Sequence, residues 1–324
     1  MILILTHTDG FEPDLVIDIL RSRNIQFARL NFDEFPIRKK ITINHDIGKP
    51  SILIDLNKVR LRISDIGVVW FHELPRFKFD STVANKNAYA IMLDETTALV
   101  DGLWELLSCK WINHPLSINR ASNKIYQLQL AQEIGFLIPP TIITNDPKQA
   151  INFHIKHKGD IIIKDLNVNA ALINGQFFGS FTTLVSQNML ENLSLVKLAP
   201  VMLQKYIQKS YEIRITIVGN KIFAAGLDSQ LYEISKIDWR RHNLDEVMRN
   251  WIVDLPVDIS EKCLKLLNSL GLEYGAIDMI VTPQNEFYFL EINTTGAWAW
   301  FQKNVGFPIS SAFVDLLVSL ENNR

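Results

Sequence analysis

The sequence contains little cysteine, little glycine and no excess of either charge. Its 324 residues include two cysteines and 14 glycines, and 33 basic against 35 acidic residues leave a net charge of −2. Two cysteines, Cys109 and Cys263, cannot build a disulfide framework or a thiolate metal site alone, and a reducing cytoplasm fits them. The near-neutral charge gives no electrostatic argument for nucleic acid or an anionic membrane as the main partner.

Several common motifs are also missing. The chain has no Gly-x4-Gly-Lys-Ser/Thr phosphate loop, no Gly-x-Gly-x-x-Gly, no His-Glu-x-x-His and no Gly-x-Ser-x-Gly. It has no apolar run of the roughly 18 residues that cross a bilayer, so we expect no membrane span. The opening Met1-Ile-Leu-Ile-Leu has no basic region and predicts a first strand rather than a signal peptide.

The order of predicted elements divides the chain into three parts. Residues 1–116 alternate strands with helices, which predicts a mostly parallel α/β sheet. Residues 117–199 form an α+β piece, in which a helix over 122–134 stops at Gly135, a left-handed C-cap. Residues 200–324 are rich in strands and end in an amphipathic helix. At 48% hydrophobic and 21% charged residues, the composition is that of an ordinary folded protein.

Residues 274–293 predict a β-hairpin with an acidic end. Apolar and aromatic β-formers flank a turn-like cluster at 283–285. A turn centred between residues 284 and 285 puts Asp278 directly across from Glu291, with Asn293 two residues further along the same face. Because opposed carboxylates repel, we interpret these oxygens as a Mg²⁺ site. An edge hairpin with solvated acids stays open as the alternative.

Two lysines stand where they could hold the phosphates of a nucleotide. Lys124 lies at the start of a helix, where both the ammonium and the helix N-terminus favour anions. Lys164 ends the apolar strand Ile161-Ile-Ile-Lys164, and a buried ammonium needs a partner. The alternatives are a solvated helix face for Lys124 and a side chain that reaches solvent past the strand end for Lys164.

Three further segments carry candidates. The backbone of strand 201–207 could offer an adenine edge one donor and one acceptor, although taken by itself the segment is better explained as a plain core strand. Glu212 and Arg214 share one face of the next strand, which suits a sugar hydroxyl plus a phosphate, or a solvent-facing salt-bridge ladder. Guanidinium groups in Asp238-Trp-Arg240 could hold a carboxylate or an acyl phosphate bidentately.

Taken in order, these features resemble the ATP-grasp superfamily. The resemblance implies an ATP-grasp fold, with a pre-ATP-grasp α/β domain over 1–116, a central lid over 117–199 and a C-terminal subdomain with the metal site over 200–324. It implies ATP and Mg²⁺ as cofactors. The implied phosphate ligands are Lys124 and Lys164, the adenine site is Gln204, Lys205, Tyr206 and Ile207, the ribose ligand is Glu212, and the Mg²⁺ ligands are Asp278, Glu291 and Asn293.

Within that superfamily the chain resembles the graspetide (microviridin-type) peptide ligases. The similarity lies in Asp238-Trp-Arg240 and in the run Glu291-Ile-Asn-Thr-Thr-Gly-Ala-Trp-Ala-Trp300. It implies a cytoplasmic enzyme, often a homodimer, that macrocyclises a ribosomal precursor peptide made of a leader and a Ser/Thr/Asp/Glu-rich core. In such enzymes ATP activates an Asp or Glu side chain as an acyl phosphate. A Ser/Thr hydroxyl or a Lys amine then attacks to give an ω-ester or an ω-amide.

For this chemistry we expect Arg214 and Arg240 to clamp the substrate carboxylate, with Asp238 as a weak candidate for the general base. We expect the leader to dock near 186–198. One departure from the family is 167–171, which lacks the glycines usual in a phosphate-covering loop. Two other functions stay open: an ATP-grasp ligase that joins free amino acids or extends a peptide tail, and a non-catalytic nucleotide-binding protein.

Overall fold

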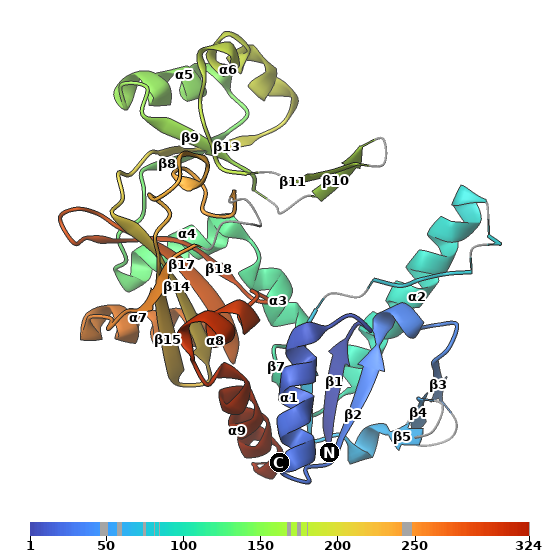
Figure 1. The fold of residues 1–324 in the computed structure, drawn as a ribbon. Helices are drawn as coiled ribbons and strands as arrows, with labels where there is room; N and C mark the ends of the chain where they lie inside the picture. Colours follow the sequence, from blue (N-terminus) through green and yellow to red (C-terminus); the bar gives the residue numbers. More distant parts are fainter. Residues whose placement is uncertain are drawn as a thin grey trace.

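The computed structural model describes residues 1–45, 51–56, 60–73, 76–80, 82–83, 85–166, 170–173, 176–179, 181–241 and 248–323. Figure 1 shows an N-terminal sheet with its helices, a small central sheet at the opposite end, and a larger antiparallel sheet next to both. Residues 167–169, in the loop that lacks glycines, and the predicted turn at Asn174-Gly175 lie outside the described residues. Within the described ranges, no helix is long and apolar enough to cross a membrane.

The N-terminal sheet is parallel, as predicted, with the strand order β2-β1-β6-β7. Alternate residues of β1 face opposite cores, because Ile2 and Ile4 pack with α1 while Leu3 and Leu5 pack with α2. A separate antiparallel sheet, β3-β4-β5, extends this part. The elements are β1 (Ile2–Thr6), α1 (Phe11–Ser22), β2 (Phe27–Asn31), β3 (Lys40–Asn44), β4 (Ser51–Asp55), β5 (Arg60–Arg62), β6 (Val68–Phe71), α2 (Lys86–Leu106), β7 (Lys110–Ile112) and α3 (Pro115–Ala121).

The central sheet has the order β12-β9-β13-β8, and α5 covers it. Its strand β13 lies beyond the expected boundary at 199, yet it pairs with β8 and β9. Helix α4 ends at Gly135, whose φ of 98° confirms the predicted left-handed cap. The elements are α4 (Lys124–Ile134), β8 (Thr141–Thr144), α5 (Pro147–Lys156), β9 (Ile161–Lys164), β10 (Ala170–Ile173), β11 (Gln176–Gly179), β12 (Thr183–Leu184), α6 (Gln187–Glu191) and β13 (Val201–Lys205).

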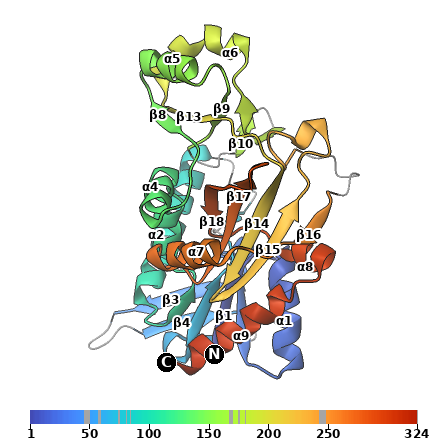
Figure 2. The same ribbon diagram turned by 90° about the vertical axis from the view of Figure 1, so that its left-hand side faces the viewer.

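The C-terminal sheet is antiparallel and has the order β16-β15-β14-β17-β18. One face packs on α4 and α7, which lie side by side in Figure 2, and buries Ile213, Ile215 and Ile277. Period-two alternation turns Glu212, Arg214 and Asp278 to the other face. The elements are β14 (Tyr211–Val218), β15 (Lys221–Leu227), β16 (Asn250–Ile252), α7 (Val257–Ser269), β17 (Tyr274–Val281), β18 (Phe287–Asn293), α8 (Ala299–Val305) and α9 (Ile309–Asn322).

The acidic hairpin forms with the predicted pairing of Asp278 and Glu291, but this pairing results from a β-bulge rather than from the predicted turn position. Asp278 does pair with Glu291, whereas Val281 pairs with Phe287, so the turn is centred on residue 284 and not between 284 and 285. A bulge inserts Leu290 between the two registers and restores the Asp278–Glu291 pairing. The predicted turn position was therefore wrong, and the bulge is what sets the two carboxylates across from each other.

Helix α9 joins the C-terminal part to the N-terminal sheet through Phe313. This fully buried ring lies 4.7 Å from Trp70 of β6, 5.0 Å from Tyr274 of β17 and 5.4 Å from Trp298, measured between ring centroids. The predicted apolar face of the last helix is confirmed, since Ile309 and Leu317 are also buried. One side chain thus fills the contact between strands that are far apart in the sequence.

Replacing Phe313 with Ala should lower the free energy of unfolding by about 3–5 kcal/mol, because a buried ring is lost and its cavity cannot close against three other aromatic rings. Urea unfolding followed by tryptophan fluorescence measures the change. Ser319→Ala, an exposed position on the same helix, is the matched control and should change stability by less than about 0.5 kcal/mol. An unchanged unfolding midpoint for Phe313→Ala would show that the cluster is not a cooperative core.

Candidate active site

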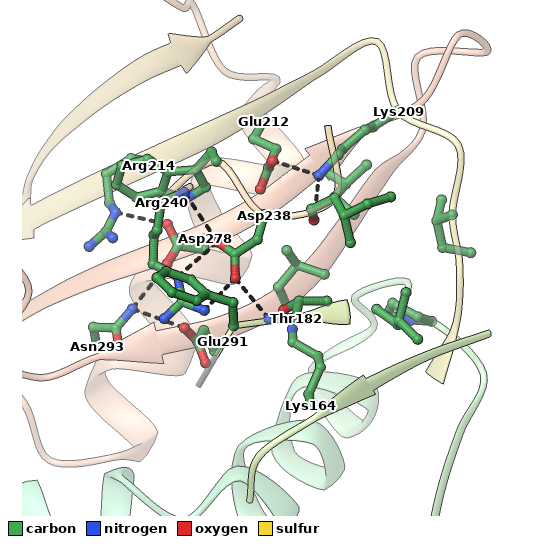
Figure 3. Close-up of a pocket in the computed structure, with 18 of the residues that line it drawn as sticks. Lys164, Thr182, Lys209, Glu212, Arg214, Asp238, Arg240, Asp278, Glu291 and Asn293 are labelled. Carbon is green, nitrogen blue, oxygen red and sulfur yellow. Dashed lines mark hydrogen bonds and ion pairs between the residues drawn. The ribbon is translucent and has the colours of Figure 1, made fainter. Parts of the chain in front are cut away.

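A cavity of about 340 Å³ opens between the central and C-terminal sheets (Figure 3). Every residue predicted for the site lines it except Gln204. Its lining combines basic and acidic side chains with the rings of Phe181 and Trp239. The alternatives with solvated acids or a solvent-facing ladder are wrong, because Asp278, Glu212 and Arg214 are each less than 10% exposed. Buried charges at this density must pair with one another or with a ligand.

Gln204 lies just behind the cavity wall. It is fully buried, and its Nε2 donates to Thr141 Oγ1 at 2.9 Å. Its Oε1 accepts no hydrogen bond from any residue in the described ranges. The next residues, Lys205 to Ile207, do line the cavity. The N–H of Tyr206 already donates to Asp160 O at 2.8 Å, so it is not free for a ligand such as adenine.

The acidic end of the cavity is formed by β17 and β18. Arg214 Nε lies 2.8 Å from Asp278 Oδ1, and Lys124 Nζ lies 3.2 Å from Glu291 Oε2. Asn293 Nδ2 donates to Asp278 Oδ2 at 3.0 Å and more weakly to Glu291 Oε1 at 3.5 Å. The hairpin therefore brings together the three residues predicted to bind a metal.

The two carboxyl groups differ strongly in pKa. The pKa of Asp278 is raised to about 7, mainly by burial; Arg214 opposes the rise, and the nearby carboxylates of Glu291 and Glu212 add to it. Burial also acts to raise the pKa of Glu291, but the ammonium groups of Lys164 and Lys124 outweigh it and lower the value to about 2. Asp278 is thus the carboxyl group whose negative charge the nearby cations do not balance.

The donor set fits a hard divalent cation. Asp278 Oδ1 is buried, and the angle of its contact with Arg214 leaves it without a hydrogen-bond partner among the described residues. The amide of Asn293 would present its oxygen after a flip, an orientation that positions of heavy atoms alone do not fix. Within the described ranges, no three His, Cys, Asp or Glu side chains gather as metal ligands. Two carboxylates plus an amide leave positions for water and phosphate oxygens, which Mg²⁺ prefers.

Two lysines extend along the cavity from this acidic end. Lys124 also donates to Asp165 O at 3.1 Å, which ties the start of α4 to the end of β9. Lys164 donates no hydrogen bond within the described part of the chain, and burial lowers its pKa although Glu291 opposes that shift. An ammonium group placed in this way favours an anionic ligand, which supports the prediction of a phosphate site.

Lys209 lies at the other end of the cavity and was not among the residues predicted from the sequence. Its Nζ is buried, contacts Glu212 Oε1 at 2.6 Å and donates to Ile237 O at 3.2 Å. A lysine in a loop is usually solvated, so its position three residues before Glu212 was the only signal in the sequence. Because one oxygen of Glu212 is held by Lys209, the other remains for a ligand hydroxyl.

The predicted arginine clamp is only partly free. Arg240 forms a two-pronged pair with Asp238, with Nε–Oδ1 at 2.8 Å and Nη2–Oδ2 at 2.5 Å, and Thr182 N donates to Asp238 as well. Burial alone would raise the pKa of Asp238, but the hydrogen bonds from Arg240 lower it, which makes Asp238 a poor general base. Arg240 remains at the mouth of the cavity, where 42% of its side chain is exposed.

Arg214 has a donor to spare. Its Nη1 is buried without a hydrogen-bond partner among the described residues, and its guanidinium lies 5.5 Å from the ring of Trp239. Gly296 makes room for this group, because a Cβ there would lie 2.7 Å from Arg214 Nη1. A buried, unsatisfied N–H that faces a cavity points to an anionic ligand.

Family models match nearly the whole chain. Residues 1–119 match the family described as MvdD pre-ATP grasp domain, and residues 123–298, more than half of the chain, match the ATP-grasp domain of prokaryotic glutathione synthetase. The predicted ATP-grasp fold with an N-terminal pre-ATP-grasp domain is confirmed.

Solved structures agree. A RiPP-associated ATP-grasp ligase of Chryseobacterium gregarium, in complex with ADP and a leader and core peptide, is 32% identical with a TM-score of 0.91, over 98% of this chain and 96% of that one. The macrocyclase MdnC of Microcystis aeruginosa, bound to the precursor peptide MdnA, is 31% identical with a TM-score of 0.88, over 98% and 99%. RiPPs are ribosomally synthesised and post-translationally modified peptides.

Curated relatives are more distant. The tetrahydromethanopterin:alpha-L-glutamate ligase of Methanocaldococcus jannaschii is 25% identical over 207 residues, and the alpha-aminoadipate–LysW ligase of Sulfurisphaera tokodaii is 21% identical over 195. Each match covers 59% of this chain, and the chain spans 64% and 65% of the length of these proteins.

The pKa of Asp278 predicts how the stability of the metal-free protein depends on pH. The group titrates near pH 7 when folded and near 4 when unfolded, so the folded state binds the extra proton between these values. Its stabilising effect is full below about pH 4 and is lost as the pH rises towards 7. Glu291 adds no slope there, since its lowered pKa contributes stability that is already present above about pH 5.

We therefore expect the free energy of unfolding of the wild-type protein to fall by roughly 1–4 kcal/mol more than that of Asp278→Asn between about pH 5 and pH 8. Urea titrations in EDTA at several pH values measure both slopes. Parallel slopes would contradict the raised pKa of Asp278.

Proposed function

Because the chain belongs to the RiPP-associated ATP-grasp ligases, we propose that it uses ATP to macrocyclise a ribosomally made precursor peptide. The observation that carries the proposal is the cavity itself, which joins a free buried guanidinium donor at Arg214 to a carboxylate pair at Asp278 and Glu291. An enzyme that phosphorylates a carboxylate needs both, one for the substrate anion and one for the metal that carries the phosphates.

The residues that hold the nucleotide and its metal divide into four groups by role. Lys124 and Lys164 neutralise phosphate oxygens, and Glu212, fixed by Lys209, accepts a hydrogen bond from a ribose hydroxyl. The wall from Lys205 to Ile207 holds the adenine, for which the N–H of Ile207 is available because it donates to no other described residue. Asp278, Glu291 and Asn293 would hold Mg²⁺, which supplies charge neutralisation for the transferred phosphoryl group.

Arg214 and Arg240 act at the acceptor end. Arg214 Nη1 donates to the side-chain carboxylate of the peptide, and Arg240 at the cavity mouth holds the same group after phosphorylation. The carboxylate oxygen takes the γ-phosphoryl group and ADP leaves. A hydroxyl or amine of the peptide then bonds to the acyl carbon, phosphate leaves with the oxygen, and the displaced proton passes to solvent or phosphate. Each ring removes the mass of one water from the peptide.

Mass spectrometry with candidate precursors tests the proposal. Loss of whole waters from one peptide, only when ATP and Mg²⁺ are present, is expected. Mass gain would instead favour a ligase that adds amino acids, the chemistry named for the curated relatives. Absence of ATP hydrolysis with any candidate peptide would favour a non-catalytic nucleotide-binding protein. The proposal includes a cytoplasmic location and a homodimer, which stay predictions.

The leader is expected to dock on the segment 186–198. It exposes Met189, Leu195 and Leu198, the last with 75% of its surface accessible, beside the central sheet. Apolar side chains left open in this way suit an amphipathic peptide. Deleting the leader should weaken peptide binding, and unchanged affinity would refute this placement.

Glu291→Gln should abolish peptide-dependent ADP release, by at least about 100-fold, because it removes a charged oxygen from the metal site and the partner of Lys124. The melting temperature checks that the fold is intact. Glu286→Gln, an exposed position in the same hairpin, should keep full activity. Turnover retained in Glu291→Gln would refute the metal assignment.

Lys209→Met should raise the KM for ATP about tenfold with kcat within about threefold, because Glu212 loses the partner that orients it while the acceptor end is untouched. Lys221→Met, which breaks a surface pair with Asp315, is the control. If kcat falls and the KM for ATP does not change, Lys209 does not act through the ribose site.

A further inference from the structure

Strand β18, which carries Glu291 and Asn293, is the edge strand of its sheet. Its inner edge pairs with β17. Its outer edge meets no other strand of the described chain and has a single bridge, between Tyr288 and Leu137, in which Phe289 N donates to Leu137 O at 2.8 Å. Buried backbone N–H and C=O groups must find partners, and an edge strand with few partners can shift along its neighbour. The question is what fixes the outer edge of the strand that presents the metal ligands.

Gln127 of α4 fixes the residue between the two ligands. Its Oε1 accepts from Ile292 N at 3.0 Å, and its Nε2 donates to Ile292 O at 3.0 Å. The same Nε2 donates to Ala121 O, and the side chain is 3% exposed. A buried amide thus takes the place of a neighbouring strand at one position, with Glu291 on one side of it and Asn293 on the other.

Asn113, which follows β7, fixes the next backbone carbonyl in the same way. Its Nδ2 donates to Thr294 O at 3.2 Å and to Tyr274 O at 2.8 Å. Its Oδ1 accepts from Tyr274 N and from Glu273 N at 3.0 and 2.7 Å. The side chain is buried and ties the end of β18 to the start of β17 through a residue of the N-terminal part.

Glu12 of α1 fixes the far end of this segment. Its Oε1 accepts from Ala299 N at 2.8 Å and from Trp298 N, and its Oε2 lies 3.1 Å from His72 Nε2. Between these anchors Gly296 packs against Arg214, and Tyr274 donates to its carbonyl oxygen. The three anchors span the segment Glu291–Ala299, whose residues 291, 293, 296 and 297 line the cavity.

We propose that Gln127 is a positioning residue for the metal–nucleotide complex, and that Asn113 and Glu12 complete the support. This inference rests on the proposed function. Side chains from the first 127 residues hydrogen-bond to the backbone of β18 and of the segment that follows it. The N-terminal part and α4 therefore fix the orientation of Glu291 and Asn293. Partners of this kind orient metal ligands without touching the metal, and their loss typically lowers metal affinity 10- to 100-fold.

Gln127→Met and Gln127→Glu separate positioning from packing. Methionine keeps the volume but leaves both backbone groups of Ile292 unpaired, while glutamate can still accept from Ile292 N and repels Ile292 O and Ala121 O. Gln129→Met is the matched control, since Gln129 lies two residues along the same helix and its side chain bonds, among the described residues, only to exposed Glu133. Melting temperatures identify any variant that does not fold.

Two affinities are measured for each variant. The first is that for Mn²⁺ in the presence of a non-hydrolysable ATP analogue, followed by electron paramagnetic resonance. The second is that for the analogue without metal. We expect both Gln127 variants to bind Mn²⁺ at least about tenfold more weakly, with affinity for the metal-free analogue within about threefold, and Gln129→Met to match the wild type. The inference would be overturned if both Gln127 variants bound Mn²⁺ as tightly as the wild type. It would also be overturned if their affinity for the metal-free analogue fell as much as their affinity for Mn²⁺.

Failure of the proposed metal–nucleotide site, on which this inference rests, gives a different result. In that case the wild-type protein itself binds no Mn²⁺–analogue complex, and Asp278→Asn makes no difference. If the wild type binds the complex, Asp278→Asn does not, and the Gln127 variants do, the metal site stands and only the positioning role is lost.

Discussion

The opposition of two carboxyl groups, the buried Asp278 and the mostly buried Glu291, is the interaction on which the rest of the structure depends. Facing each other across β17 and β18, they would repel strongly without compensation. Lysines compensate the charge of Glu291, whereas Asp278 has a misaligned contact with Arg214 and a hydrogen bond from the uncharged amide of Asn293. The cavity therefore has an unmet demand for positive charge at one carboxyl group and for negative charge at one guanidinium. A metal-bound nucleotide and a substrate carboxylate meet these two demands together.

The position of the cavity follows from the way the sheets meet. The central sheet contributes Lys164 and the wall after β13, and the C-terminal sheet contributes the acidic face. Neither sheet closes the site alone, so a change in their separation would open or close it. By contrast, the N-terminal sheet is joined to the C-terminal part through the aromatic contacts of Phe313 and the buried anchors Asn113 and Glu12.

Similarity to peptide-bound ligases and the geometry of the site lead to the same conclusion by separate routes. The fold likeness alone would serve many ligases, since the curated relatives act on quite different acceptors. The specific argument lies in Arg214, whose free donor faces the cavity next to Trp239, while the ring of Phe181 lies beside Arg240. Aromatic walls beside a guanidinium suit a peptide side chain more than a small free amino acid.

The sequence by itself determined the elements and most of the site, because period-two alternation and charge at strand ends are local properties. It placed Asp278 and Glu291 at the same end of one hairpin, the ammonium groups of Lys124 and Lys164 beside them, and the left-handed cap at Gly135. Only the tertiary structure decided what depends on distant contacts. The bulge at Leu290 is one such feature. Burial of Lys209 against Glu212 is another, and the support of Ile292 by Gln127 across 165 positions of sequence is a third, because no pattern along the chain records which backbone groups an edge strand leaves unpaired.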